Sequence, residues 1–411
     1  MGDKKNLPTE KYNKKNSISC KRALFVTTTA SMIDQFNRGN IALLQKMGYE
    51  VHVACNLTFG NSMSTVSTQK FIDDMNEIGV RIFDYPFTRH PFAYGRNLRL
   101  SWKLRKQIKK YRYKIIHCHT PVGSVAARIA AAFNVKKWGG RVIYTAHGFH
   151  FYRGAPLKNW LIFYPIEREL SWFTDTLITI NTEDYACVKN SFHARDIVYV
   201  PGVGVDTNVY TDVGLSKKKK NDLRDKKLPV RCSLNNVILF SVGELNDNKN
   251  HRVVIEALGR LNDPNIYYFI AGIGGNKENL QKRIEELGLS KRVHLLGYRD
   301  DIEDLMRLSD VFILPSKREG LNVSLMEAMS SGLPCVVSDI RGNRDLIKQG
   351  QGGYLLEPNN IDKWEKILRY ICNSLDKRIK LGENNRETMK RFSKYRVQKI
   401  MKKIYNDDKE R

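Results

Sequence analysis

Cysteine is scarce in this sequence and forms no recognisable pattern. Seven cysteines are scattered along 411 residues, and no two of them stand in a C-x2-C pair. An odd number without such pairs argues against both a disulfide framework and a zinc-finger site. We therefore expect reduced, buried thiols, as in a cytoplasmic protein.

Long apolar runs are also missing. No uninterrupted apolar stretch approaches the ~18 residues that a membrane-spanning helix requires, so we expect any membrane contact to be peripheral. Residues 1–21 are polar and basic and contain no apolar core of the kind found in secretion signals. This segment is expected to be a disordered basic tail, and the protein is expected to stay in the cytoplasm.

Acidic residues are outnumbered. The chain has 69 Lys and Arg against 43 Asp and Glu, which gives a formal net charge of +26. Such an excess predicts anionic partners, namely nucleotide phosphates, the anionic inner surface of a membrane, or nucleic acid. The lysine run at residues 217–220 has no nucleic-acid-binding motif around it, so nucleic acid is the weakest of these candidates.

Apolar residues make up 42% of the chain, enough for the cores of two or three domains. Apolar runs at residues 23–28 and 49–55, joined by a helical pattern that ends at Gly48, predict a strand–helix–strand unit. A comparable series of elements starts again at residues 237–243. The predicted fold class is therefore α/β with doubly wound domains.

Residues 96–111 have the pattern of an amphipathic helix. Leu100, Leu104 and Ile108 fall on one face, and the opposite face carries Arg and Lys side chains. A solvated charged face is the ordinary explanation, and docking on anionic lipid is the alternative. The sequence leaves both explanations open.

Several side chains of the first half are candidates for function. His147 follows a predicted strand at its carboxyl end, the edge where parallel sheets bind ligands. His117 and His119 share one side of another predicted strand, but two histidines without a third ligand rarely hold a metal. The aromatic and basic segment around Arg89 either packs at the edge of the domain or forms part of an acceptor surface.

Residues 315–334 are the most informative part of the sequence. Short apolar runs flank them, which predicts a loop and a helix between two buried parallel strands, with the helix beginning near Asn322. Gly320 lets the backbone approach a ligand, and the amides at the helix start attract an anion. Glu319 in the loop and Glu327 in the helix would then place two carboxylates along one extended polar ligand.

This Glu-x7-Glu pattern, with Pro-Ser before it and Ala-Met-Ser-Ser-Gly-Leu-Pro after it, resembles the motif of retaining, family-4-type glycosyltransferases of the GT-B architecture. The resemblance extends over residues 22–400 and is most specific in 237–345. It implies two facing Rossmann-like domains with a cleft between them. Residues 22–206 would bind the acceptor, residues 207–385 would bind a nucleotide-sugar, and residues 386–411 would form a helix that crosses back to the first domain.

The resemblance also implies a role for each matched residue. Glu327 would bind the ribose hydroxyls of a UDP-sugar, Glu319 the sugar hydroxyls, and Lys249 the diphosphate. The implied donor-binding residues are Gly243, Lys249, Gly272, Tyr298, Arg299, Glu319, Gly320, Leu321, Asn322, Val323 and Glu327. The implied catalytic residues are His147, Glu319 and Lys249. On the acceptor side the candidates are Ser31, Asn37, Arg89 and His150. No metal or other cofactor is expected.

Some positions depart from the family pattern. Glu244 stands where the family has an arginine that binds the diphosphate, so helix-start amides or another cation, for example Arg318, would have to supply that charge. Residues 27–31 replace the usual glycine pair of the first loop, which leaves the ligand of that loop open.

The sequence of residues 34–37 and 145–152 is similar to that of bacterial capsule and exopolysaccharide enzymes. This similarity implies a polyprenyl-diphosphate-linked saccharide as acceptor, at the cytoplasmic face of the membrane, and an N-acetylhexosamine as the transferred sugar. Two other classes of function remain compatible with the sequence. A UDP-sugar epimerase of GT-B fold would isomerise the donor without transferring it. A non-catalytic basic protein would bind membrane or nucleic acid in a salt-sensitive manner, without affinity for UDP.

Overall fold

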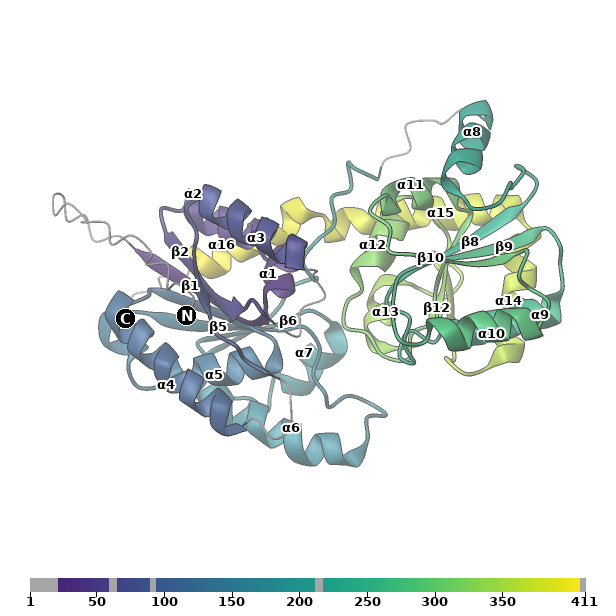
Figure 1. The fold of residues 1–411 in the computed structure, drawn as a ribbon. Coiled ribbons are helices and arrows are strands. Elements are labelled where there is room, and N and C mark those ends of the chain that lie inside the picture. The colour runs from purple at the N-terminus through teal and green to yellow at the C-terminus, as the bar shows by residue number, and fades with distance from the viewer. Residues whose placement is uncertain (1–20, 59–64, 89–93, 211–216, 407–411) are drawn as a thin grey trace, which may run out of the picture.

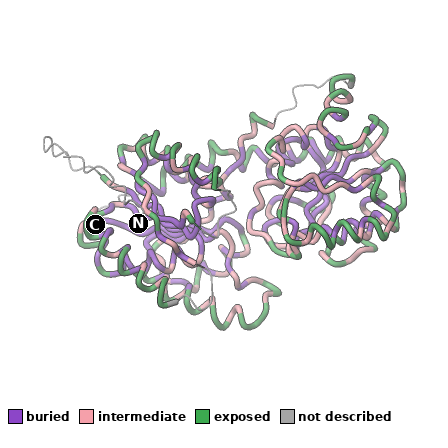
Figure 2. Tube along the Cα trace, in the orientation of Figure 1, coloured by how far each residue is buried: buried purple, intermediate pink, exposed green. Residues whose placement is uncertain are grey.

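The computed structural model describes residues 21–58, 65–88, 94–210 and 217–406. The tail expected at residues 1–21 therefore lies almost wholly outside the described residues, and so does Arg89. The described chain forms two α/β domains that are joined by a linker and by the last helix (Figure 1). In each domain the buried residues gather at the central sheet and on the inner sides of the helices, and the exposed residues lie mostly at the outside (Figure 2). The predicted pair of Rossmann-like domains is confirmed.

The first domain is built on a seven-stranded parallel sheet in the order β3-β2-β1-β4-β5-β6-β7. Its strands are β1 (Arg22–Thr29), β2 (Glu50–Asn56), β3 (Arg81–Asp84), β4 (Ile115–His119), β5 (Arg141–Ala146), β6 (Thr176–Thr179) and β7 (Asp196–Tyr199). Its helices are α1 (Ala30–Phe36), α2 (Arg38–Lys46), α3 (Thr65–Glu77), α4 (Tyr94–Tyr111), α5 (Pro121–Ala131), α6 (Leu157–Leu170) and α7 (Thr182–Val188), with 3₁₀ turns η2 (Val135–Trp138) and η3 (Ser171–Phe173). Strands β4 and β5 are buried along their whole length because helices cover both faces of the sheet.

Two helical layers enclose this sheet. Helices α1, α2 and α3 pack into one apolar core, while α4, α5 and α6 pack into the core on the opposite face. The amphipathic pattern predicted for residues 96–111 is confirmed, since Leu104 and Ile108 of α4 are fully buried. Lysines on the other side of α4, among them Lys106 and Lys109, are exposed.

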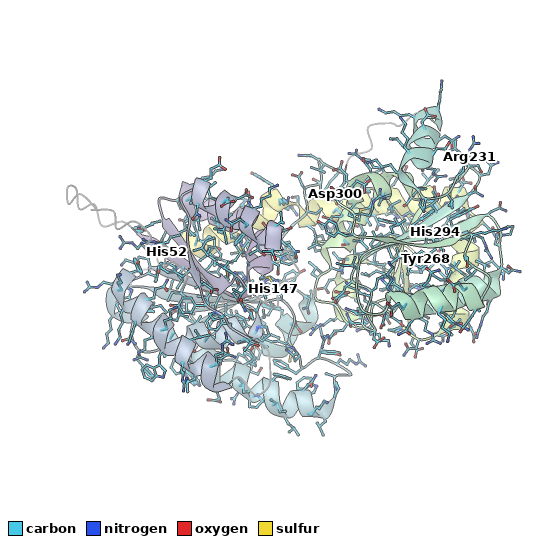
Figure 3. All side chains as sticks on the ribbon, in the orientation of Figure 1. His52, His147, Arg231, Tyr268, His294 and Asp300 are labelled. Carbon is cyan, nitrogen blue, oxygen red and sulfur yellow. The ribbon has the colours of Figure 1, made fainter. Side chains whose placement is uncertain are left out.

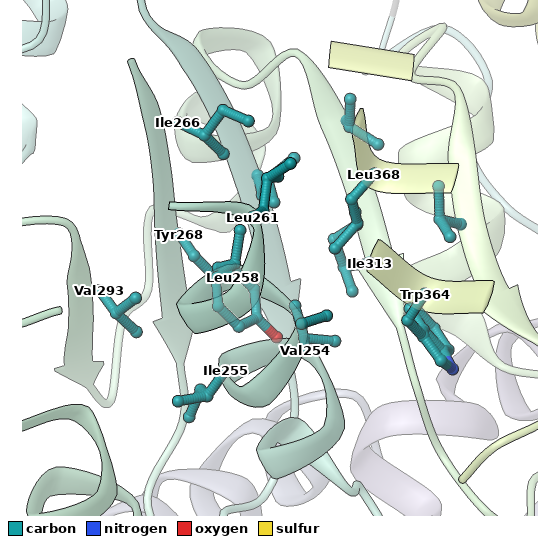
Figure 4. Packing of buried hydrophobic residues seen from close by; sticks show 14 of the residues in the cluster. Val254, Ile255, Leu258, Leu261, Ile266, Tyr268, Val293, Ile313, Trp364 and Leu368 are labelled. Atoms are coloured by element: carbon teal, nitrogen blue, oxygen red, sulfur yellow. The ribbon is translucent and has the colours of Figure 1, made fainter. Parts of the chain in front are cut away.

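The second domain is built on a six-stranded parallel sheet in the order β10-β9-β8-β11-β12-β13. Its strands are β8 (Val237–Val242), β9 (Ile266–Ala271), β10 (Val293–Gly297), β11 (Val311–Leu314), β12 (Cys335–Ser338) and β13 (Gly353–Leu356). Its helices are α8 (Lys217–Lys227), α9 (His251–Leu261), α10 (Lys277–Glu286), α11 (Ile302–Leu308), α12 (Val323–Ser330), α13 (Arg341–Leu346), α14 (Ile361–Cys372) and α15 (Leu375–Met389), followed by the 3₁₀ turn η4 (Lys390–Phe392). Figure 4 shows Val254 and Leu258 of α9 packing with Ile313 and with Trp364 and Leu368 of α14 in the core of this domain.

The last described helix, α16 (Lys394–Asn406), packs on the first domain although it follows the second in the chain (Figure 1). Backbone hydrogen bonds join Val205 of the linker to the segment just before α16, at Phe392, and to Lys394. Near the end of α16, the hydroxyl of Tyr405 lies 2.8 Å from Nδ1 of His117 in β4. This helix therefore ties the two domains together independently of the linker.

Candidate active site

The loop between β11 and α12 carries the first of the two predicted glutamates. Glu319 lies in this loop, and α12 begins at Val323. Asn322 caps the helix, because its side-chain oxygen accepts a hydrogen bond of 3.0 Å from the backbone N–H of Leu325. The helix start predicted near Asn322 is confirmed, and Glu327 stands inside this helix.

Lys249 forms an ion pair with Glu319. Its Nζ lies 2.7 Å from Oε1, and the two side chains are only 17% and 14% exposed. The place of Lys249 depends on Gly243, just after β8, where an added Cβ would lie 3.0 Å from Lys249 Cε. Gly272, just after β9, is packed even more tightly, since a Cβ there would lie 1.8 Å from the carbonyl oxygen of Gly243. These four residues thus lie together at the carboxyl edge of the second sheet.

Glu327 borders a cavity of about 490 Å³ between the two domains. Asn37 and His147 line the same cavity from the first domain, and residues 202–206 line it from the linker. Burial raises the pKa of the Glu327 carboxyl, and a hydrogen bond from Tyr210 opposes that rise. The carboxyl is therefore held by one hydroxyl beside a space that is large enough for part of a ligand.

His147 faces the second domain from the end of β5 (Figure 3). Its Nε2 lies 3.0 Å from Nδ1 of His119, at the end of the neighbouring strand β4. Burial lowers the pKa of His147 to about 4 and holds the pKa of His119 well below its ordinary value. Both rings are therefore neutral at neutral pH, and one donates a hydrogen bond to the other. Among the described residues, Nε2 of His119 is buried without a partner.

His119 was not singled out as an active-site residue from the sequence. The signal that could have found it is the pairing of β4 with β5, which sets His119 opposite Thr145 and so near the strand end that carries His147. His117, two residues earlier, has a structural role, because its ring nitrogens each lie 2.8 Å from a hydroxyl, one of Tyr405 and one of Thr145. Within the described part of the chain, no group of three His, Cys, Asp or Glu side chains is placed to hold a metal.

Arg341, at the start of α13, joins the two domains at the site. Its Nη1 lies 2.7 Å from Oδ1 of Asp184 in the first domain, and both side chains are at most 5% exposed. Its Nη2 donates to the carbonyl of Phe149 at 2.9 Å, and its Nε donates to the carbonyl of Glu319 at 3.2 Å. Arg341 thus links the loop that carries Glu319 to the segment that follows His147.

A smaller cavity of about 270 Å³ adjoins this contact, and His147, Asn248, Arg318 and Glu319 line it. Here the backbones of the two domains are closely packed, since a Cβ on Gly320 would lie 2.2 Å from the carbonyl oxygen of His147. His147 therefore borders both cavities, whereas Glu319 borders the smaller and Glu327 the larger.

The remaining donor-site predictions lie farther out. The Tyr298 side chain is 78% exposed, and the Arg299 guanidinium makes two hydrogen bonds of 2.7 Å to Asp301. Neither residue lines either cavity, so their role in donor binding stays a prediction. Leu321 is buried in the core of the second domain, and Val323 lines the larger cavity.

The acceptor-side predictions are divided in the same way. Asn37 is buried and lines the larger cavity, with its amide donating to the carbonyl of Met32. The hydroxyl of Ser31 is buried against Thr29, and Ser31 lines neither of these two cavities. His150 lines the smaller cavity. These roles, too, stay predictions.

Comparison with known proteins decides the family. The model for "Glycosyltransferase Family 4" matches residues 41–209, and the model for "Glycosyl transferases group 1" matches residues 229–388. EpsD of Bacillus subtilis (strain 168), itself provisionally assigned as a glycosyltransferase, is 36% identical over 389 residues, which cover 94% of this chain and 96% of EpsD. The chain belongs to the family-4 glycosyltransferases.

A further relative and a solved structure are similar to most of the chain. The Escherichia coli UDP-Gal:α-D-GlcNAc-diphosphoundecaprenol α-1,3-galactosyltransferase is 30% identical over 329 residues, covering 76% of this chain and 82% of that enzyme. The crystal structure of Anabaena HepE in complex with UDP superposes with a TM-score of 0.73 at 19% identity, covering 94% of this chain and 99% of HepE. The structural match confirms the GT-B architecture.

Proposed function

We propose that this glycosyltransferase transfers a sugar from a UDP-sugar to a polyprenyl-diphosphate-linked saccharide, with retention of the anomeric configuration, in capsule or exopolysaccharide assembly. The observation that carries the proposal is that Glu319, paired with Lys249, borders the smaller interdomain cavity, Glu327 borders the larger, and His147 borders both. A cation, two carboxylates and a neutral imidazole suit a ligand that is charged in its middle and rich in hydroxyls at both ends.

In this proposal the donor binds at the charge pair on the rim of the second domain. A diphosphate would compete with Glu319 for the Lys249 ammonium, and Glu319 would then be free to accept hydrogen bonds from sugar hydroxyls. Lys249 would stabilise the negative charge that develops on the departing UDP. Glu327, at the larger cavity, would hold the ribose hydroxyls.

His147 would act as a neutral group. Because burial lowers its pKa to about 4, it offers a hydrogen bond and no positive charge to the transferred sugar near neutral pH. Retention would follow if the acceptor hydroxyl attacks on the face from which UDP departs, with the departing phosphate accepting the proton. The expectation that no metal is required stays a prediction, which activity in the presence of a chelator would test.

The acceptor and the location rest on the relatives and on charge. The E. coli relative is named for a diphosphoundecaprenol acceptor, and a formal net charge of +26 favours the anionic cytoplasmic face of the membrane. None of the described helices is long and apolar enough to cross a membrane. We expect an N-acetylhexosamine donor, and the UDP-Gal named in that relative makes a hexose the first alternative.

A panel of UDP-sugars tests the proposal. UDP-GlcNAc, UDP-GalNAc, UDP-Gal and UDP-Glc are each compared for protection against thermal unfolding, since a ligand that binds the folded state raises the melting temperature. The protective donor is then incubated with a synthetic polyprenyl-diphosphate-linked saccharide, and NMR reports the configuration of the new linkage. We expect transfer with retention. Isomerisation of the donor without transfer would establish an epimerase instead, and no response to any UDP-sugar would refute the donor class.

A further inference from the structure

The outward face of α6 is apolar. Four of its large aliphatic side chains are strongly exposed: Leu157 (72%), Leu161 (69%), Ile162 (53%) and Ile166 (45%). The aromatic residues of the same helix, Trp160, Phe163 and Tyr164, turn inward and pack against the core of the first domain. Single exposed aliphatic residues are common, but a whole helical face of them marks a surface that binds something.

Neighbouring elements extend this surface. Phe133, just after α5, is 76% exposed and contacts Phe173 of η3 edge-on, with ring centroids 5.3 Å apart. Trp172 of η3 is 59% exposed. Helix α5 packs against both α6 and η3. We call the exposed side chains of these elements the apolar face: Phe133, Leu157, Leu161, Ile162, Ile166 and Trp172.

The same helical layer is strongly basic at α4. Helix α4 contains seven Lys and Arg and no Asp or Glu, and it packs against α5 on the face of the sheet that α6 also covers. Figure 1 shows α4, α5 and α6 together below the sheet of the first domain. Trp102 of α4 is 60% exposed among these cations. One layer thus combines a positive field with large apolar side chains.

We propose that this layer docks on an anionic lipid bilayer, with α4 attracting the headgroups and α6 burying the apolar face at the boundary between headgroups and acyl chains. Interfacial binding of this kind adds buried apolar area to electrostatic attraction. A second copy of the chain is the poorer occupant, because a two-fold contact through this layer would set the seven cations of one α4 near those of the other.

Docking there would bring the bilayer to the acceptor side of the site. Helix α6 begins seven residues after His150, and Nδ2 of Asn159 donates to the His150 carbonyl at 2.9 Å. The segment from His147 to His150 lines the smaller cavity. This inference rests on the proposed function, because docking is useful only if the acceptor is anchored in the bilayer and must reach the cleft without leaving the membrane.

Vesicle flotation of the full chain tests the surface with matched variants. L161E/I162E places two charges on the apolar face, and L375E/I379E places the same two charges on α15, where the side chains are similarly exposed (61% and 52%). With vesicles of phosphatidylcholine mixed with phosphatidylglycerol, we expect L161E/I162E to lower the partition coefficient about tenfold or more. The α15 variant should bind like the wild type.

A second pair of variants tests the contribution of the α4 cations to vesicle binding. K106E/K109E reverses two exposed charges on α4, and K363E/K366E reverses two exposed charges at the same spacing on α14. We expect the α4 variant alone to lose about tenfold in binding and most of the salt dependence. Vesicles of phosphatidylcholine alone should bind the wild type weakly.

Two outcomes would overturn the proposal. One is equal vesicle binding by L161E/I162E and L375E/I379E. The other is a wild-type dimer, seen by analytical ultracentrifugation, that L161E/I162E converts to a monomer, because a second copy would then be the occupant. Protection by a UDP-sugar against thermal unfolding is measured on each variant as well. That response reports the donor site, so its absence in the wild type would refute the proposed function without touching the vesicle result.

Discussion

The two sides of the cleft differ in the charge of the side chains that they present. The rim of the second domain presents a charge pair, Lys249 with Glu319, that is partly open to solvent. The rim of the first domain presents two histidines, His147 and His119, that bond to each other and are held neutral by burial. In the proposed function this difference becomes a division of labour, in which Lys249 of the second domain binds the charged diphosphate and the histidines of the first domain contact only neutral groups of the ligand.

The contrast has a simple physical origin. Burial disfavours the charged form of a histidine that is enclosed by aromatic rings and neighbouring histidines, whereas the Lys249–Glu319 pair sets two opposite charges against each other. Phe25 stacks on His119 at 6.0 Å between ring centroids, and Phe36 lies 6.1 Å from His147. The surroundings of the two rims therefore set the charge of each, and mutations on the two sides should have different signatures.

The largest effect is expected from Lys249→Ala. It removes the cation that we propose to stabilise the departing UDP and leaves Glu319 unpaired, so kcat should fall about 10³-fold and UDP affinity should fall with it. Steady-state kinetics and UDP titration measure the two losses. Glu244 stands at the position of the family arginine and cannot supply that second cation to the diphosphate. Lys317→Ala, on the same loop as Glu319, is the control and should retain both. Unchanged UDP affinity in Lys249→Ala would mean that the diphosphate binds elsewhere.

A smaller and different loss is expected from His147→Ala. The imidazole is neutral, so its removal should lower kcat about 10²-fold and leave UDP binding almost unchanged. Calorimetric titration with UDP separates this signature from that of Lys249→Ala. A loss of UDP affinity as large as that of Lys249→Ala would show that both domains hold the diphosphate, and the division of labour would be wrong.

The part of the second-domain rim formed by the loop after β11 and by α12 could be predicted from sequence because it is local. Glu319, Asn322 and Glu327 lie within one loop and the helix that it opens, where a cap and a glycine are readable from residue types. Gly243 and Lys249 were assigned through the family resemblance, and the ion pair of Lys249 with Glu319, 70 residues further along the chain, was not predicted. The alternation of strands and helices likewise predicted two doubly wound domains.

The first-domain rim depends on contacts between distant segments, which residue spacing does not reveal. The pairing of His119 with His147 requires β4 and β5 to be neighbours with a particular register. The hydrogen bond of Tyr210 to Glu327 and the bridge of Arg341 to Asp184 join the linker and the two domains. The apolar face of α6 was missed because a helical pattern rich in apolar residues predicts a helix without saying which side faces the solvent.

Acidification should destabilise the first domain before the second. Burial lowers the pKa of His147 from an ordinary value of 6.5 to about 4 and that of His117 to about 3. Between pH 6.5 and these lowered pKa values, the unfolded chain binds protons at these histidines and the folded chain does not. The stabilisation is therefore complete above pH 6.5 and is lost progressively as the pH falls toward 4. In the second domain, His251 is the buried histidine with a comparably lowered pKa among the described residues.

Amide hydrogen exchange at pH 7.5 and pH 5 would resolve the two domains, with β4 and β5 losing protection first at the lower pH. His117→Gln is the informative variant, since it removes one of the titrating groups while its amide can still bond to a hydroxyl. Its exchange should depend less on pH than that of the wild type. Equal loss of protection in β8 and β11 would show that the histidine cluster does not set the acid limit.

The smallest effect is expected from His119→Asn, which tests whether His119 positions His147. The asparagine amide can replace the ring nitrogen that lies 3.0 Å from His147 Nε2, so kcat should fall by less than about tenfold, with KM for the donor unchanged. His119→Leu leaves His147 without that partner and should approach the loss seen for His147→Ala. A purely structural role would instead lower the melting temperature of both variants alike and leave the kcat of the folded fraction intact. The difference in kcat between His119→Asn and His119→Leu therefore decides whether His119 positions His147 or only packs against it.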